Sequence, residues 1–333
     1  MLLTTLTGTT GAVHALTVTP ADRVSVTGAS DAANREISVR VRSALVDRKR
    51  DATGTVTVPS GAGAACDLAV ALALAPELAH GFDAAIGELS LAGEVRCVQG
   101  IIPRLEALRD AGVKRCLVPA QQLEAGAVPG IEVFGLSHLG GEPRPLPAWA
   151  WREPEYPSLD DITGLDEAKA ALRTAVTEGH DVLLVHEPGA GATMLARRAL
   201  ELLPPLTDEA RLEIARIWSA SGLPVSPALG RPFRAPHHTV SATGLAGGGR
   251  PVRPGEVTLA HGGVLFLDEV ASFSRAAISA LHAALDHHEV RGMDAHPRVI
   301  IAACTEAELP RIEGEFLARF DRIVLPAPKR RGE

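Results

Sequence analysis

The sequence predicts an α/β protein in which an N-terminal α+β domain precedes a core built on a parallel sheet. Three observations support this prediction. The chain has 333 residues, which is enough for two ordinary domains. Hydrophobic residues make up 46% and charged residues 22%, as in a folded globular protein. A proline-rich stretch separates two different patterns, so we expect domains at 1–140 and 159–328 and a linker at 141–158.

The linker is predicted from its prolines and aromatic residues. Proline fixes φ and removes a backbone donor, so this stretch should run extended between two folded units. The aromatic residues should anchor it to a domain surface. The residues concerned are Pro143, Pro145, Pro147, Trp149, Trp151, Pro154, Tyr156 and Pro157.

Before the linker, strands and helices are mixed. Apolar and polar residues alternate on both sides of Ala92-Gly93, which indicates a hairpin. One apolar segment and one segment with a polar face indicate helices. The expected elements are a strand at 55–58, a helix at 66–78, a hairpin at 85–98, a helix at 104–111 and a strand at 114–119.

After the linker, short apolar strands are separated by helices. Such strands imply a parallel sheet that is covered on both faces. The expected helices are 165–178 and 193–203, and the expected strands are 181–185, 263–267, 298–303 and 322–325.

Charge and cysteine content exclude several classes of protein. The net charge of −7 excludes a largely basic surface for nucleic acid but leaves a local basic patch open. No apolar run is long enough to span a membrane, and the N-terminus lacks the positive flank of a signal peptide. The four cysteines lack CxxC spacing, so we expect a reduced, cytoplasmic protein without a membrane partner.

A glycine-rich turn follows the strand at 181–185 and opens a helix. Free N–H groups and the helix dipole make such a turn a site for anions. The phosphate-loop pattern G-x-x-x-x-G-K-[ST] fits except at two positions, where His186 replaces the first Gly and Ala192 replaces the Lys. An ordinary strand-turn-helix corner is the alternative. The predicted nucleotide-binding residues are Pro188, Gly189, Ala190, Gly191, Ala192, Thr193 and Met194.

A second apolar strand, at 263–267, ends in two acidic residues. In a nucleotide site of this kind, Asp268 would hold Mg²⁺ together with Thr193, and Glu269 would orient the attacking water. An apolar strand that ends in acids is common by itself. Its place after a phosphate loop favours the nucleotide interpretation.

The chain then carries a specific resemblance. The segments RPFRAPHHT at 231–239, GGGRPVRPGE at 247–256 and LAHGGVLFLDE at 259–269 resemble the ComM/YifB type of magnesium-chelatase-like AAA+ ATPases. The likeness covers about 157–326. It implies a P-loop AAA+ core, ATP and Mg²⁺ as cofactors, assembly into a ring, and work on DNA such as branch migration.

The resemblance also implies roles for two further residues. Arg319 would reach the γ-phosphate of a neighbouring subunit, and Thr305 stands where the family has a sensor Asn. The alternative for Arg319 is a solvated side chain paired with Asp321. A metal site at His237-His238 is disfavoured, because adjacent loop histidines should point to opposite sides and lack partners at ligand spacing.

The N-terminal domain carries a likeness in the segment GELSLAGEVR at 87–96, which continues through Arg104-Leu-Glu-Ala to Val118-Pro119. These residues resemble the amino-terminal part of the same family, which has a Lon-protease-like fold. A Lon-type protease needs a Ser nucleophile and a Lys base. The chain has Gly63-Ala64-Ala65 and Ile101-Ile102-Pro103 at those places, so proteolysis is disfavoured. We expect Cys66 to be a small buried residue rather than a nucleophile.

Three departures from the family bear on hydrolysis. The phosphate-loop Lys is replaced, 305–310 replaces a Cys-rich stretch, and the sequence stops after Pro328-Lys-Arg-Arg331, before a helical lid. We therefore expect binding of ATP or ADP with weak or lost hydrolysis. The alternative is a non-catalytic interaction or scaffold protein that co-assembles with an active relative.

Overall fold

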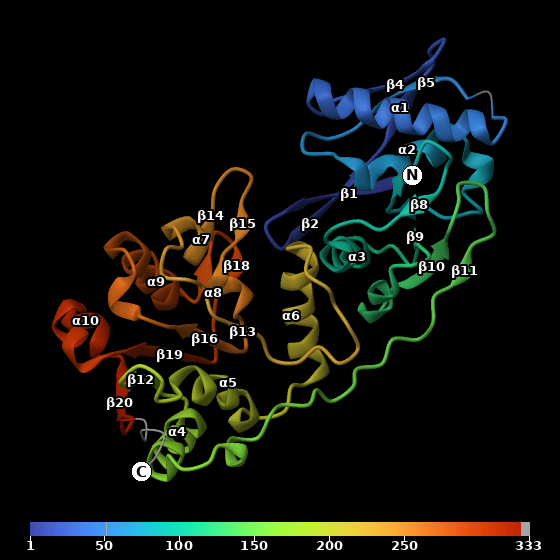
Figure 1. Cartoon of the computed structure of the whole chain (residues 1–333). Helices are drawn as coiled ribbons and strands as arrows, with labels where there is room; N and C mark the ends of the chain where they lie inside the picture. The colour runs from blue at the N-terminus through green and yellow to red at the C-terminus, as the bar shows by residue number, and fades with distance from the viewer. Residues whose placement is uncertain (51, 328–333) are drawn as a thin grey trace. The chain divides into compact units, whose positions relative to one another are not determined.

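The computed structural model describes residues 1–50 and 52–327, which form two compact units (Figure 1). The first unit holds Met1–Trp151 and Trp218–Pro227, and the second holds Arg152–Ile217 and the chain from Ala228 onward. The expected linker at 141–158 therefore contains the division between them. Pro328-Lys-Arg-Arg331, where we expected the core to end, lies outside the described residues.

The first unit is a mixed α+β structure. A six-stranded sheet has the order β11-β10-β9-β6-β1-β2, a three-stranded sheet has the order β3-β5-β4, and β7 pairs with β8. Its helices are α1 (Asp31–Asp47), α2 (Asp67–Leu74) and α3 (Ile101–Asp110). Its strands are β1 (Leu2–Thr7), β2 (Thr10–Ala15), β3 (Thr17–Thr19), β4 (Val24–Thr27), β5 (Gly54–Thr57), β6 (Ala84–Ala85), β7 (Glu88–Leu89), β8 (Val95–Arg96), β9 (Arg115–Pro119), β10 (Glu132–Leu136) and β11 (Arg144–Pro145).

The second unit is built on a five-stranded sheet of order β13-β16-β19-β12-β20. Helix α6 (Asp208–Ala220) crosses the division, because its last residues belong to the first unit. The other helices are α4 (Asp166–Glu178), α5 (Ala192–Leu202), α7 (Ala242–Ala246), α8 (Glu256–Leu259), α9 (Arg275–His287) and α10 (Gly314–Leu317). The strands are β12 (Asp181–Val185), β13 (Phe233–Arg234), β14 (Gly247–Gly248), β15 (Arg253–Pro254), β16 (Val264–Leu267), β17 (Glu289–Val290), β18 (Met293–Asp294), β19 (Val299–Cys304) and β20 (Phe320–Val324).

All neighbouring strands of this sheet are parallel, which confirms the prediction of an α/β core. Successive side chains of a strand point to opposite faces, so each strand serves two cores. Val182 and Leu184 pack on the side of α4 and α5, whereas Leu183 and Val185 pack on the side of α7 and α9 (Figure 1). The apolar runs in the sequence reflect this burial on both faces.

The six predicted elements of the second unit agree with the structure to within two residues at each end. Strand β12 has the predicted bounds 181–185, and α5 begins at Ala192 rather than Thr193. In the first unit, the predicted helix 66–78 is shorter than expected. Helix α2 ends at Leu74, because Pro76 has no N–H for the ladder and starts a separate 3₁₀ turn, Pro76–Leu78.

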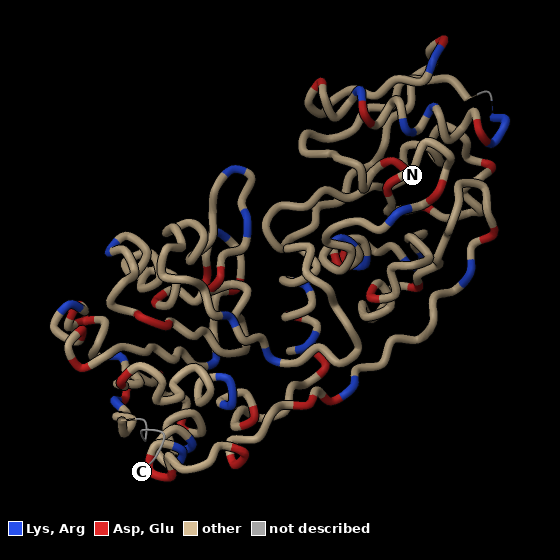
Figure 2. Tube along the Cα trace, viewed as in Figure 1, with Lys and Arg blue, Asp and Glu red and all other residues tan. Residues whose placement is uncertain are grey.

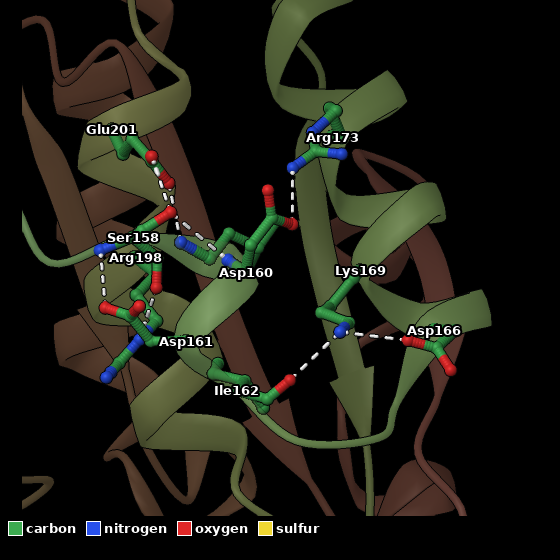
Figure 3. Close-up of polar contacts among 10 residues, drawn as sticks. Ser158, Asp160, Asp161, Ile162, Asp166, Lys169, Arg173, Arg198 and Glu201 are labelled. Atoms are coloured by element: carbon green, nitrogen blue, oxygen red, sulfur yellow. Dashed lines mark hydrogen bonds and ion pairs between the residues drawn. The ribbon is translucent and has the colours of Figure 1, made fainter.

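The segment that enters the second unit is clamped to α5 (Figure 3). Ser158 caps a 3₁₀ turn, Leu159–Asp161, through a reciprocal bond with Asp161. Glu201 accepts hydrogen bonds from Ser158 Oγ at 2.8 Å and from the backbone N–H of Leu159 at 2.6 Å. Arg198 Nε donates to the Ser158 carbonyl at 3.0 Å. These contacts fix the helix whose N-terminus forms the site described below.

Charge is distributed over both units. Acidic and basic residues are interspersed along the trace, and basic residues gather at the tip of the β14–β15 hairpin (Figure 2). These are Arg250, in the turn between β14 and β15, and Arg253, the first residue of β15. Within 1–50 and 52–327, no helix has the length and apolar character that crossing a bilayer requires.

Candidate nucleotide-binding site

The candidate site lies where the strand order of the second unit reverses. From β12 the chain passes to β13 at one edge, returns through β16 and β19, and then crosses to β20 on the other side of β12. In open parallel sheets, the crevice at the carboxyl ends of strands beside such a reversal is the usual ligand site. The glycine-rich turn follows β12 at this place.

Two glycines shape the turn. Gly189 and Gly191 have φ of 85° and 93°, values that side chains with a Cβ rarely adopt. The backbone N–H of Ala190 donates to the Glu187 carbonyl at 3.1 Å and closes the turn. Gly191 is the N-cap of α5, and no side chain of the described residues caps it. The first N–H groups of α5 are thus available to an anion, together with the positive end of the helix dipole.

The acidic pair after β16 lies against this helix. Thr193 Oγ1 donates to Asp268 Oδ2 at 3.3 Å, so the two groups expected to hold Mg²⁺ are adjacent. Asp268 Oδ1 accepts from the backbone N–H of Glu269 at 3.1 Å. Glu269 has a φ of 51°, a strained conformation for a residue with a side chain, and strain of this kind is common at functional sites.

A cleft of about 570 Å³ joins these groups. It contains all but two of the residues selected from the sequence. Ala190 is buried behind the turn, and Arg319 lies elsewhere. The lining residues are His186, Pro188, Gly189, Gly191, Ala192, Thr193, Met194, Asp268, Glu269, Cys304, Thr305 and Glu308.

Three residues that line the cleft were not predicted to do so from the sequence. They are His186, Cys304 and Glu308. Glu308 Oε2 accepts from both the backbone N–H and the Oγ1 of Thr305, each at 2.9 Å. The spacing T-x-x-E is a capping-box pattern and could have revealed this contact. Burial raises the pKa of the Cys304 thiol to about 11, so this thiol is protonated at neutral pH.

The loop after β13 also reaches the site. His238 Nδ1 lies 3.0 Å from Glu269 Oε2 and holds that carboxylate. The expectation that His237 and His238 point to opposite sides is wrong, because their rings lie side by side with centroids 4.1 Å apart. His237 Nδ1 lies 2.9 Å from the hydroxyl of Thr239, so the two histidines have different polar partners.

Arg319 lies outside the cleft and is held by its own chain. Its Nη1 donates to Asp286 Oδ1 of α9 at 3.2 Å. The alternative that paired Arg319 with Asp321 is wrong, because Asp321 Oδ2 is 2.8 Å from His180 Nδ1. Within a regular strand, side chains two residues apart point to the same face. Arg319 lies before the start of β20, so its side chain need not point in the same direction as that of Asp321.

The residues of the cleft fit a metal-bound phosphate. Mg²⁺ prefers oxygen ligands and completes its shell with waters and phosphate oxygens. The hydroxyl of Thr193 and the carboxylate of Asp268 are such ligands, and the open N–H groups of α5 suit phosphate. Within the described chain, no three His, Cys, Asp or Glu side chains gather to hold a metal by themselves.

Sequence comparisons identify relatives of both units. The family described as "Magnesium chelatase, subunit ChlI" matches residues 158–305, and "Subunit ChlI of Mg-chelatase" matches 15–122. An uncharacterized protein of Mycobacterium tuberculosis is 37% identical over 80% of this chain and 59% of its own length. Escherichia coli YifB is 32% identical over 73% and 56%, and the Haemophilus influenzae competence protein ComM is 34% identical over 71% and 55%. The chain thus spans a little over half the length of these relatives.

Solved structures give weaker likenesses. The Thermotoga maritima RuvB Holliday junction branch migration motor has a TM-score of 0.33 at 19% identity, covering 50% of this chain and 46% of that protein. Brucella abortus NtrX, in complex with ATP, has a TM-score of 0.35 at 19% identity, with 50% and 39% covered. The assignment to a family therefore rests on the sequence matches.

Proposed function

The chain belongs to the magnesium-chelatase-like proteins of the ComM/YifB type, and from this premise we propose that it binds ATP or ADP with Mg²⁺ while hydrolysing ATP weakly or not at all. The observation that carries the proposal is the cleft in which the open N-terminus of α5 meets Thr193 and Asp268. Open backbone donors, a helix dipole and two oxygen ligands at one place form a phosphate and metal site.

Each residue has a defined part in this proposal. The N–H groups of Ala192, Thr193 and Met194 would bind phosphate oxygens, and Pro188 to Gly191 shape the turn that exposes them. Thr193 and Asp268 would hold Mg²⁺, which neutralises phosphate charge when bound. Glu269, which also lines the cleft, would orient a water molecule.

Three features of the chain support weak hydrolysis. Ala192 supplies no ammonium to the phosphates. The hydroxyl of Thr305 donates its hydrogen bond to Glu308. This hydroxyl proton is therefore not directed at a substrate. His238 holds Glu269 and competes with a water for its carboxylate. Phosphoryl transfer depends on positioning and charge stabilisation, so these effects should compound.

The alternative function is that of a non-catalytic scaffold that co-assembles with an active relative. Its support is the charge of the cleft, whose described lining includes three carboxylates and no Lys or Arg. Ring assembly and action on DNA are extensions of the proposal that the family likeness suggests. The arginines of the β14–β15 hairpin, Arg250 and Arg253, are where a DNA backbone would meet basic side chains.

Calorimetric titration with millimolar MgATP separates these two functions. We expect weak but measurable binding by the full chain, and further weakening in Thr193→Val, which removes only the hydroxyl. Thr174→Val is the matched control, because Thr174 is an exposed helical residue that bonds the Ala170 carbonyl outside the cleft. Absence of heat in the folded protein would leave the scaffold function.

Phosphate release measures the second part of the proposal. We expect the turnover of the full chain to be near background and to be the same in Glu269→Gln. Robust turnover that Glu269→Gln abolishes would show that hydrolysis is intact and would overturn this part of the proposal.

A further inference from the structure

One wall of the cleft is formed by the residues that follow β19. Strand β19 lies between β12 and β16 in the sheet, and Val185 pairs with Cys304. The chain leaving β19 therefore stands between the glycine-rich turn and the acidic pair. Thr305 and Glu308 both line the cleft at this place. A terminal phosphate held between the turn and Asp268 would lie next to them.

The carboxylate of Glu308 is fixed and charged. It accepts hydrogen bonds from the backbone N–H and the hydroxyl of Thr305, each at 2.9 Å. These two bonds lower the pKa of Glu308, so the group is ionised at neutral pH. The side chain is a fixed negative charge rather than a mobile surface residue.

Two basic groups, His186 of the lining and Arg311 beside it, favour the ionised form of Glu308. The described lining itself includes no Lys or Arg that would offset its acidic side chains. Asp268 and Glu269 add two more carboxylates, and Ala192 stands where the phosphate-loop pattern has its Lys. Two like charges a few ångströms apart repel appreciably at the reduced dielectric of a protein cleft. Bound Mg²⁺ would offset part of the phosphate charge in both a nucleoside diphosphate and a nucleoside triphosphate, so it does not distinguish the two ligands. The third phosphate is therefore the part of the ligand that Glu308 disfavours.

We propose that Glu308 is a specificity-determining residue that makes the cleft favour a nucleoside diphosphate over a triphosphate. This inference rests on the proposed function, since it concerns the same cleft. It goes further by stating which ligand occupies the cleft preferentially and which side chain makes the choice.

The test uses a variant that changes charge without changing geometry. In Glu308→Gln, the amide oxygen can still accept both bonds from Thr305, because Glu and Gln serve equally in a capping box. Glu306→Gln is the matched control. It removes the same charge from the same 3₁₀ turn, Glu306–Arg311, but Glu306 does not line the cleft and pairs with Arg322.

Calorimetric titration of the full chain with MgADP and with MgATP gives the two dissociation constants for each variant. We expect the wild type and Glu306→Gln to bind MgADP about tenfold more tightly than MgATP, which corresponds to about 1.4 kcal/mol. Glu308→Gln should lose most of this preference by gaining affinity for MgATP, with little change for MgADP. Thermal unfolding confirms that all three proteins are folded.

The outcomes separate this inference from the proposed function. An equal preference in the wild type and Glu308→Gln, with binding intact, overturns the role of Glu308 and leaves the proposed function standing. The same shift in both variants attributes the effect to general charge and also overturns the role of Glu308. Absence of binding by every variant overturns the proposed function and this inference with it.

Discussion

Ala192 is the residue on which the strength of phosphate binding depends. It begins α5 at the floor of the cleft, with its small side chain 4% exposed. The turn before it keeps the glycines that expose backbone donors, so the position has the geometry of a phosphate loop without its ammonium group. A charge-assisted hydrogen bond is stronger than a neutral one by about 1 kcal/mol or more.

Ala192→Lys should therefore tighten the binding of MgATP. A charge-assisted contact contributes about 1.5–3 kcal/mol, or about a ten- to hundredfold change in affinity. We expect phosphate release to stay near background, because Thr305 and Glu269 keep their present partners. Calorimetry measures the affinity, and Ala276→Lys, at an exposed position of α9, controls for added charge. An unchanged affinity for MgATP in a folded Ala192→Lys variant would show that the phosphates do not bind at the start of α5.

Among single residues, the sequence could identify those whose role follows from a short motif around them. The glycine turn, Thr193 and Asp268 were predicted together, because a strand end and a helix start bring them to one edge. The contact between His238 and Glu269 could not be predicted, since it joins a loop and a strand end through the fold. The partner of Arg319 likewise depends on where α9 packs.

At the scale of elements, the junction of α1 and α2 places an ionisable group in the core of the first unit. Asp67 begins α2 with a fully buried side chain and pairs with Arg40 of α1 at 2.6 Å. It also accepts a bond from the backbone N–H of Leu89 at 3.1 Å. Burial raises the pKa of Asp67 from 3.8 to about 6, against the opposite effect of Arg40. Desolvation therefore outweighs the ion pair.

This raised pKa makes the first unit less stable as pH rises. Between pH 3.8 and about 6, the folded state binds the Asp67 proton while the unfolded state releases it, so stability falls through this interval. The loss is about 3 kcal/mol in total, at about 1.4 kcal/mol per pKa unit. Asp67→Asn should remove this part of the pH dependence.

Denaturant unfolding followed by tryptophan fluorescence measures the effect in the first unit, which contains all three tryptophans, Trp149, Trp151 and Trp218. The readout is the slope of the unfolding free energy against pH, since Asp67→Asn also removes the nearer charge partner of Arg40 and leaves it with Glu36 at 3.6 Å. Asp110→Asn, at an exposed carboxylate beside Arg109, is the control. Equal slopes in Asp67→Asn and the wild type would contradict the prediction.

The elements themselves were predictable to different degrees. Buried parallel strands such as β12 and β16 read as short apolar runs, because both of their faces are covered. Helix α1 and strands β1 to β4 were not predicted. For α1 the signal was present, because its buried residues Ile37, Val41 and Leu45 recur at helical spacing. The hairpin expected at 85–98 is confirmed by the antiparallel pairing of β7 with β8. The two-residue strand β6 exists only through its partners in the sheet.

At the scale of the whole molecule, the proposed nucleotide site bears on assembly. The described residues that line the cleft include no Lys or Arg, so an arginine from a neighbouring subunit would change its charge. Arg319 has the position from which the family likeness would have it reach a neighbour. Asp286, which holds it at 3.2 Å, orients the side chain outside its own cleft.

Arg319→Ala should therefore matter only in an assembly. A trans arginine at a γ-phosphate contributes several kcal/mol to the transition state, but it adds nothing to a pocket that it does not line. We expect the lone chain to keep its affinity for MgATP and a mixed ring with an active relative to lose turnover. Arg322→Ala is the matched control, because it removes the same charge from β20, where Arg322 pairs with Glu306. Lower affinity of the monomeric Arg319→Ala would place Arg319 in its own site. Unchanged turnover of the mixed ring would reduce its role to the ion pair with Asp286.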